Sequence, residues 1–128
     1  MMGLDPKVLV RYFAQDDPLQ SPTATEIIER HLTEDEPGFA SVVTMVETVW
    51  VLSGICQLPG HEIAGVVERM LQADTLVIQV VFTAAVALKA GRGSFAGALI
   101  GAIGTWAGCA STLTFDRKAS RLGTFELL

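Results

Sequence analysis

The sequence predicts an α/β protein with a parallel β-sheet covered by helices on both faces. Short apolar segments of strand type alternate with longer helical patterns along the chain, and this order is typical of parallel sheets with both faces buried. The 128 residues fit a single domain, residues 1–128, with enough chain for an ordinary hydrophobic core. Half of the residues are hydrophobic and 18% are charged, which excludes an intrinsically disordered chain.

The first half of the chain shows a strand, helix, strand, two helices and a strand. Residues 2–4 form a short apolar strand that ends at Asp5, and residues 8–13 continue as a turn or short helix. Ser21 and Pro22 are suited to the cap and first position of a helix whose apolar face extends to residue 32. We further expect strands at 38–42 and 76–78, and helices at 43–52 and 61–71.

The second half continues the alternation. Helical patterns at 80–90 and 94–107 precede a strand at 112–115, a short basic helix at 116–122 and a last strand at 124–127. The run from Phe95 to Phe115 has no charge and is long enough to span a bilayer. It is rich in Gly, Ala, Ser and Thr and contains a helix stop at residues 108–111. A buried helix followed by a strand is therefore favoured over a membrane-associated protein.

Charge and cysteine content narrow the class of protein. The net charge is −5, which argues against a globally basic nucleic-acid binder. Residues 1–74 carry twelve acids and four bases, whereas residues 75–128 carry two acids and five bases. Either an anionic ligand finds local attraction near the C-terminal third, or these bases are ordinary solvated surface. Two cysteines and an acid near the start, where a signal peptide needs basic residues, favour a cytoplasmic protein.

Three acidic residues stand out against apolar surroundings. Asp5 and Asp116 each follow a predicted strand, and ligands of parallel sheets bind outside the carboxyl ends of the strands. Glu47 interrupts a long apolar helix, so its carboxylate must be exposed, protonated or opposite a cation. If the three converge, their mutual repulsion requires a bound cation, and oxygen ligands suit Mg²⁺ or Mn²⁺.

Four blocks of the chain resemble the PIN domain, and within it the VapC-type toxins of bacterial toxin–antitoxin pairs. The blocks are Gly3–Arg11, Ser41–Glu47, Gly93–Ile100 and Thr112–Ala119, in the family's order and at its spacing. The resemblance implies a three-layer α/β/α sandwich with a central parallel sheet. It implies a Mg²⁺- or Mn²⁺-dependent ribonuclease, homodimerisation, and inhibition by a small antitoxin protein.

The resemblance also assigns roles to individual residues. The family acids fall on Asp5, Glu47 and Asp116, and Thr114 matches the hydroxyl residue that accompanies the last acid. Two positions depart from the pattern: Lys7 stands where the family prefers Asn, and Gly97 stands where it has a third acid. Both departures make the site less negative, so we expect weaker metal binding. Lys7 either points inward to neutralise the acids or points to solvent.

The remaining expectations concern substrate contacts and the function that competes with catalysis. Arg11 and Arg92 are the predicted phosphate contacts, and Arg117 and Lys118 are predicted to guide RNA from further out. In such an enzyme the metal would be held by the three acids and would activate the attacking water. The alternative is a catalytically impaired PIN domain that binds RNA or an antitoxin without cleaving.

Overall fold

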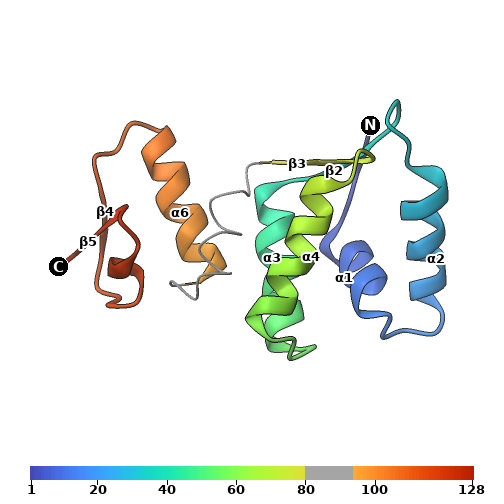
Figure 1. Cartoon of the computed structure of the whole chain (residues 1–128), viewed down its shortest axis with the longest axis horizontal. Coiled ribbons are helices and arrows are strands. Elements are labelled where there is room, and N and C mark those ends of the chain that lie inside the picture. Colours follow the sequence, from blue (N-terminus) through green and yellow to red (C-terminus); the bar gives the residue numbers. More distant parts are fainter. Residues whose placement is uncertain (80–93) are drawn as a thin grey trace. The chain divides into compact units, whose positions relative to one another are not determined.

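The computed structural model describes residues 1–79 and 94–128, and the chain divides into two compact units, Met1–Val80 and Val81–Leu128 (Figure 1). Each unit has its own helices and strands. The helix predicted at 80–90 and the Gly91–Gly93 link after it lie outside the described residues.

A three-stranded parallel sheet organises the first unit. Its strands are β1 (Met2–Gly3), β2 (Gly38–Ala40) and β3 (Leu76–Ile78), in the order β1-β2-β3. Met2 lies opposite Gly38, and Gly38 lies opposite Leu76. The parallel pairing and the three strand positions confirm the sequence prediction, although β1 and β2 are shorter than expected.

Gly38 is the position where this sheet leaves no room for a side chain. It is buried, and a Cβ atom there would lie 2.7 Å from a methyl of Leu32 and 2.8 Å from a methyl of Leu4. Glycine therefore allows the two leucines to close over the start of β2. Leu4 and Leu32 are both buried in the core that the helices form around the sheet.

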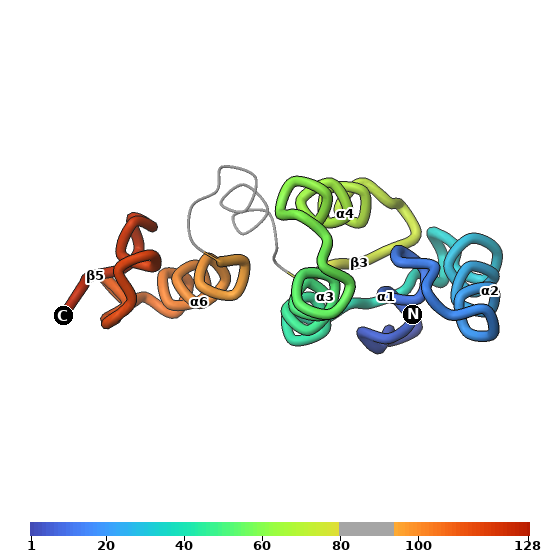
Figure 2. The backbone as a smooth tube through the Cα atoms, turned by 90° about the horizontal axis from the view of Figure 1, so that it is seen from below, coloured from blue at the N-terminus to red at the C-terminus, as the bar shows by residue number. Residues whose placement is uncertain are grey.

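Four helical segments pack around this sheet: α1 (Pro6–Ala14), α2 (Gln20–Glu26) running on into a π-helical turn η1 (Ile27–His31), α3 (Val42–Gly54) and α4 (Gly60–Gln72). Figure 2 shows α3 and α4 as separate neighbouring coils, with α1 next to α3. The core contains one buried stripe from each long helix. Its largest fully buried side chains in this unit are Leu9, Met45, Leu52, Ile63, Val67 and Met70.

Of the two options expected at 8–13, a turn or a short helix, the structure has the short helix α1. It begins earlier, at Pro6, because Asp5 caps its first turn and Pro6 occupies the first helical position. The next helix begins at Gln20, so the prediction that Ser21 caps it was wrong. Asp17 accepts hydrogen bonds from the backbone N–H groups of Leu19 and Gln20 at 2.9 and 2.7 Å, which starts the helix earlier.

The second unit contains α6 (Phe95–Trp106), β4 (Thr112–Thr114), a 3-10 turn η2 (Ala119–Arg121) and β5 (Phe125–Leu127). β4 and β5 pair in parallel. The uncharged run thus holds a helix and then a strand, as expected, and none of the helices in the described ranges is long and apolar enough to cross a membrane. The basic helix predicted at 116–122 is reduced to the short turn η2.

Two tryptophans and one cysteine are exposed within their units. Trp50 and Trp106 keep 69% and 58% of their surface accessible, and Cys109 is exposed. Trp50 lies on the same face of α3 as another exposed apolar side chain, Val43, about two turns away. The exposed face of α3 is therefore partly apolar. Residues 1–79 and 94–128 form a mixed α/β structure with two small parallel sheets.

Candidate functional site

Asp5 sits where the backbone leaves the first strand and enters the first helix. It is the N-cap of α1, and its Oδ1 accepts a hydrogen bond from the backbone N–H of Lys7 at 2.8 Å. The residue is exposed, and Oδ2 has no hydrogen-bond partner in the described part of the chain. Capping thus fixes one oxygen of the carboxylate and leaves the other open to a ligand.

Asp116 has the same local arrangement in the second unit. It follows β4, its Oδ1 accepts from the backbone N–H of Lys118 at 2.8 Å, and it is exposed. Its own N–H donates to Oγ1 of Thr114 at 3.0 Å, so the threonine hydroxyl orients the turn. Each aspartate lies two residues after the end of a parallel strand, and its Oδ1 accepts a hydrogen bond from the backbone N–H two positions later.

Glu47 lies in the middle of α3, on the face opposite the buried stripe of that helix. The sequence left the Glu47 carboxylate exposed, protonated or opposite a cation, and in the structure it is exposed. Its neighbours one turn before and after are the exposed side chains of Val43 and Trp50. An exposed carboxylate beside apolar groups carries no desolvation penalty and is free to meet a cation or a partner.

A hydrogen bond connects the first turn of α3 to the segment that carries Asp5. Oγ1 of the buried Thr44 donates to the backbone carbonyl of Leu4 at 3.3 Å. The hydroxyl of Thr48 in turn donates to the carbonyl of Thr44 at 2.7 Å. Glu47 is therefore less than one helical turn beyond a residue that directly contacts the backbone preceding Asp5.

Gln79 is a polar residue at the same edge of the sheet that the sequence reasoning missed. It directly follows β3, and its backbone N–H donates to the carbonyl of Ala40 at 3.0 Å. Its side-chain Oε1 accepts from the backbone N–H of Val42 at 3.2 Å. The signal was available, because the rule that singled out Asp5 and Asp116 also applies to a polar residue after the third strand.

The two positions that depart from the family pattern are placed differently. Lys7 is exposed and lines a groove between α1 and α2, and no ion pair within 4.0 Å joins it to Asp5 or Glu47. Lys7 thus takes the outward-pointing option rather than neutralising the acids. Gly97 lies in the first turn of α6, where its N–H donates to Oγ of the capping Ser94 at 2.9 Å. A Cβ at Gly97 would lie 3.0 Å from that same oxygen.

The basic residues predicted to touch phosphate fall into three situations. Arg11 is already engaged: its guanidinium donates to both carboxylate oxygens of Asp16, at 2.8 and 3.0 Å, and to Gln20 at 2.8 Å. Arg92 lies outside the described residues. Arg117 and Lys118 are exposed beside Asp116, and their side chains make no hydrogen bond or ion pair to any described residue. The last two are therefore the basic side chains available for an anion next to an acid.

The structure thus assigns Asp5 and Glu47 to the first unit and Asp116 to the second. No group of three or more His, Cys, Asp or Glu side chains arranged to hold a metal ion occurs among residues 1–79 and 94–128. The convergence of the three acids stays a prediction. Comparison of the chain with models of protein families, with curated proteins and with solved structures finds no match.

Proposed function

We propose that the protein is a metal-dependent endoribonuclease of the PIN-domain type, resembling the VapC-type toxins. The proposal includes the finer fold expected from the sequence, a three-layer α/β/α sandwich with one central parallel sheet. Parallel pairing of every described strand, in β1-β2-β3 and in β4-β5, supports that fold. Homodimerisation and inhibition by a small antitoxin belong to the same proposal.

The observation that carries the proposal is the shared geometry of Asp5 and Asp116. Each aspartate follows a parallel strand and is exposed. Its Oδ1 accepts a hydrogen bond of 2.8 Å from the backbone N–H two residues later. Each therefore offers one carboxylate oxygen in a fixed direction at the carboxyl end of a strand, where ligands of parallel sheets bind. Glu47 adds an exposed carboxylate from the helix that is hydrogen-bonded to the residue before Asp5.

The donor set fits a small, hard divalent cation. Asp5, Glu47 and Asp116 supply only carboxylate oxygens, which suit Mg²⁺ or Mn²⁺ better than softer metals. When bound, such an ion supplies Lewis-acid polarisation of a phosphate and a more acidic attacking water. Thr114 holds Asp116 in its turn through the 3.0 Å hydrogen bond. Arg117 and Lys118 attract the RNA phosphates, and single-stranded loops are the expected substrates.

The second candidate function is an impaired PIN domain that binds RNA or an antitoxin. Its support is the pair of departures at Lys7 and Gly97: Gly97 supplies no carboxylate where the family has one, and Lys7, which points outward, replaces the preferred Asn. In that case the acids would still be present, but metal affinity would be too low for turnover. Restoring the pattern with Lys7→Asn and Gly97→Asp should then raise both divalent-ion affinity and cleavage.

RNA cleavage by the purified full chain tests the proposal. Labelled single-stranded RNA is incubated with Mg²⁺ or Mn²⁺, and Glu47→Gln and Asp116→Asn are compared with the unchanged chain. Loss of a ligand should lower cleavage about 100-fold or more, because metal catalysis supplies several kcal/mol of transition-state stabilisation. Asp35→Asn is the matched control, since Asp35 is an exposed acid in the loop before β2.

The outcomes separate the two functions. Cleavage that depends on the ion, persists in the Asp35 variant and disappears in the Glu47 and Asp116 variants supports the enzyme. No cleavage by any variant, with RNA or antitoxin binding retained, supports the impaired module. Cleavage that is indifferent to Glu47 and Asp116 contradicts the assignment of these acids.

A further inference from the structure

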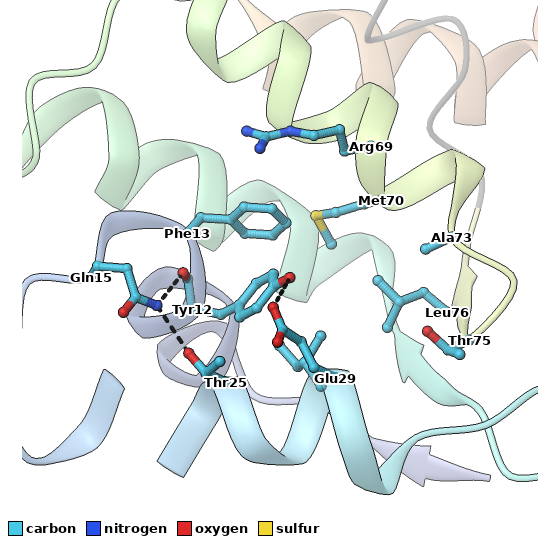
Figure 3. A pocket seen from close by; sticks show the side chains of 11 residues that line it. Tyr12, Phe13, Gln15, Thr25, Glu29, Arg69, Met70, Ala73, Thr75 and Leu76 are labelled. Carbon is cyan, nitrogen blue, oxygen red and sulfur yellow. Dashed lines mark hydrogen bonds between the residues drawn. The ribbon is translucent and has the colours of Figure 1, made fainter. Parts of the chain in front are cut away.

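A second candidate site lies at the opposite end of the β1-β2-β3 sheet from Asp5. It is a cavity of about 620 Å³ formed by α1, the α2–η1 segment, the end of α4 and the start of β3 (Figure 3). Thr75 and Leu76 line it where β3 begins, whereas Asp5 follows the end of β1. Its volume is within the range of about 300–1,000 Å³ that small-molecule sites occupy.

A cationic group with unused donors lies at this cavity. The guanidinium of Arg69 is 5.6 Å from the centre of the Phe13 ring, and its Nε donates to the carbonyl of Gly65 at 3.4 Å. Its two terminal nitrogens have no hydrogen bond or ion pair with any described residue. The exposed guanidinium thus contacts the Phe13 ring and the Gly65 carbonyl and leaves its bidentate face available.

A carboxylate with an unused oxygen also lines the cavity. Oε1 of Glu29 accepts a hydrogen bond from the hydroxyl of Tyr12 at 3.2 Å, and Oε2 has no partner in the described ranges. Burial, and then the hydrogen bond to Glu29, raise the pKa of Tyr12, so the hydroxyl stays protonated and continues to orient the carboxylate. Figure 3 shows Arg69 and Glu29 extending from different elements, with aromatic side chains between them.

The surface between the two charges is mainly apolar. Phe13, Ile28, Met70 and Leu76 supply ring, aliphatic and thioether groups to the lining. The amide nitrogen of Gln15 is already committed to the carbonyl of Tyr12 at 2.7 Å and to Oγ1 of Thr25 at 3.1 Å. Besides Glu29 and Arg69, the lining contains no residue with a formal charge. The cavity thus has one positive group and one negative group separated by an apolar surface.

Unusual backbone converges on the same cavity. Ile28 and Glu29 belong to the π-helical turn η1, and π-helical turns in proteins are frequently found at functional sites. Gln15 ends α1 with a left-handed backbone (φ 50°), which is uncommon for a residue other than glycine. These two local departures place Glu29 on the lining and close the end of α1 beside it.

We propose that this cavity binds a small zwitterion with an apolar body. Its carboxylate pairs with the free face of the Arg69 guanidinium, its ammonium pairs with Glu29, and its hydrocarbon part covers Phe13 and Met70. The proposal goes beyond the ribonuclease activity, because the residues that carry it are distinct from Asp5, Glu47 and Asp116. A ligand with only one charge leaves one of the two cavity charges unmatched.

Ligand titrations on the full chain, followed by amide chemical shifts in NMR, test this proposal. The probes are the ω-amino acids γ-aminobutyrate and ε-aminocaproate and the α-amino acid leucine, which differ in the separation of their charges. Caproate and hexylamine are the single-charge analogues. We expect the best zwitterion to bind at least about tenfold more tightly than either analogue, with shift changes at residues of the cavity.

Two pairs of variants show whether the named charges are responsible. Arg69→Met keeps the apolar stem, Glu29→Gln keeps an acceptor for Tyr12, and each should weaken the zwitterion about tenfold. Arg30→Met and Glu34→Gln remove matched exposed charges outside the cavity and should leave affinity unchanged. Circular dichroism of each variant confirms that it is folded.

Three results overturn the proposal: no zwitterion binds, the single-charge analogues bind as well, or the two cavity variants bind as the unchanged chain does. Asp5→Asn separates this site from the proposed nuclease. It should leave zwitterion affinity unchanged even if it abolishes RNA cleavage, and absence of cleavage in the unchanged chain has no bearing on the cavity.

Discussion

The two proposed roles of Asp5, as a helix cap and as a metal ligand, can be separated by comparing Asp5→Ala with Asp5→Asn. The capping bond from the Lys7 amide is 2.8 Å long. Replacing an N-cap aspartate by alanine costs about 1 kcal/mol, whereas asparagine caps almost equally well. Without metal, Asp5→Ala should therefore unfold at about 0.5 M less urea, for a typical slope near 2 kcal/mol per molar, and Asp5→Asn should be unchanged.

Mg²⁺ adds the second half of the test. An ion that binds only the folded chain stabilises it by RT ln(1 + [L]/Kd), which is about 1.4 kcal/mol at tenfold excess over Kd. Both Asp5 variants should lose this increment, because asparagine keeps the cap but not the charge. Urea unfolding followed by circular dichroism, with and without Mg²⁺, measures both effects in one experiment.

Ser41→Ala is the matched control. Ser41 caps α3 by accepting from the Thr44 amide at 3.1 Å, so its loss should also cost about 1 kcal/mol while the Mg²⁺ increment remains. If Asp5→Asn without metal is as unstable as Asp5→Ala, the capping account of Asp5 is wrong. If either Asp5 variant retains the full Mg²⁺ increment, Asp5 is not a metal ligand.

Two further predictions concern packing and pH. Gly101→Ala should lower the free energy of unfolding, measured in urea, by about 1–3 kcal/mol, because a Cβ there would meet the side chains of Thr124 and Phe125. Gly65→Ala, where a Cβ would have open space, should stabilise α4 by about 0.5–1 kcal/mol. Equal effects of the two substitutions would refute the packing argument. Backbone hydrogen bonds from Gln20 and Leu19 hold the pKa of Asp17 below its usual value of 3.8. The ionised Asp17 carboxylate therefore stabilises the folded chain above that pH, and this contribution is lost as the pH falls through the pKa of Asp17 in the folded state. The free energy of unfolding, measured between pH 2 and 7, should therefore fall less on acidification in Asp17→Asn than in the unchanged chain. An equal fall at low pH in both chains would count against this account.

The parallel sheet of the first unit could be predicted from the sequence because its signals are local. β-Branched and apolar segments bounded by polar turns identified β2 and β3 within two residues. Ser94 and Ser41 as caps follow the ordinary preference of helix starts. The start of α2 could not be assigned correctly, because Ser21 and Asp17 both have capping side chains and only the fold shows which one is used.

The candidate site could be predicted only as separate parts. Strand position located Asp5 and Asp116, and the apolar context located Glu47, but convergence depends on contacts between distant segments that no local pattern encodes. The ion pair between Arg11 and Asp16 could not be predicted either, although the two residues are only five positions apart. The Arg69–Glu29 cavity had no signal at all, since its charges come from an ordinary amphipathic helix and a π-helical turn.

Oδ1 of Asp5 and Oδ1 of Asp116 each accept a hydrogen bond from a backbone N–H, and this affects which metal ion the carboxylates suit. A carboxylate tied to its own backbone has lost most of its rotational freedom before any ligand arrives, so little further entropy is lost on coordination. Glu47, with a longer and exposed side chain, keeps that freedom. In the proposed metal site, two stiff ligands and one adaptable ligand would favour the small ion with strict octahedral demands, Mg²⁺, over the larger and more tolerant Ca²⁺.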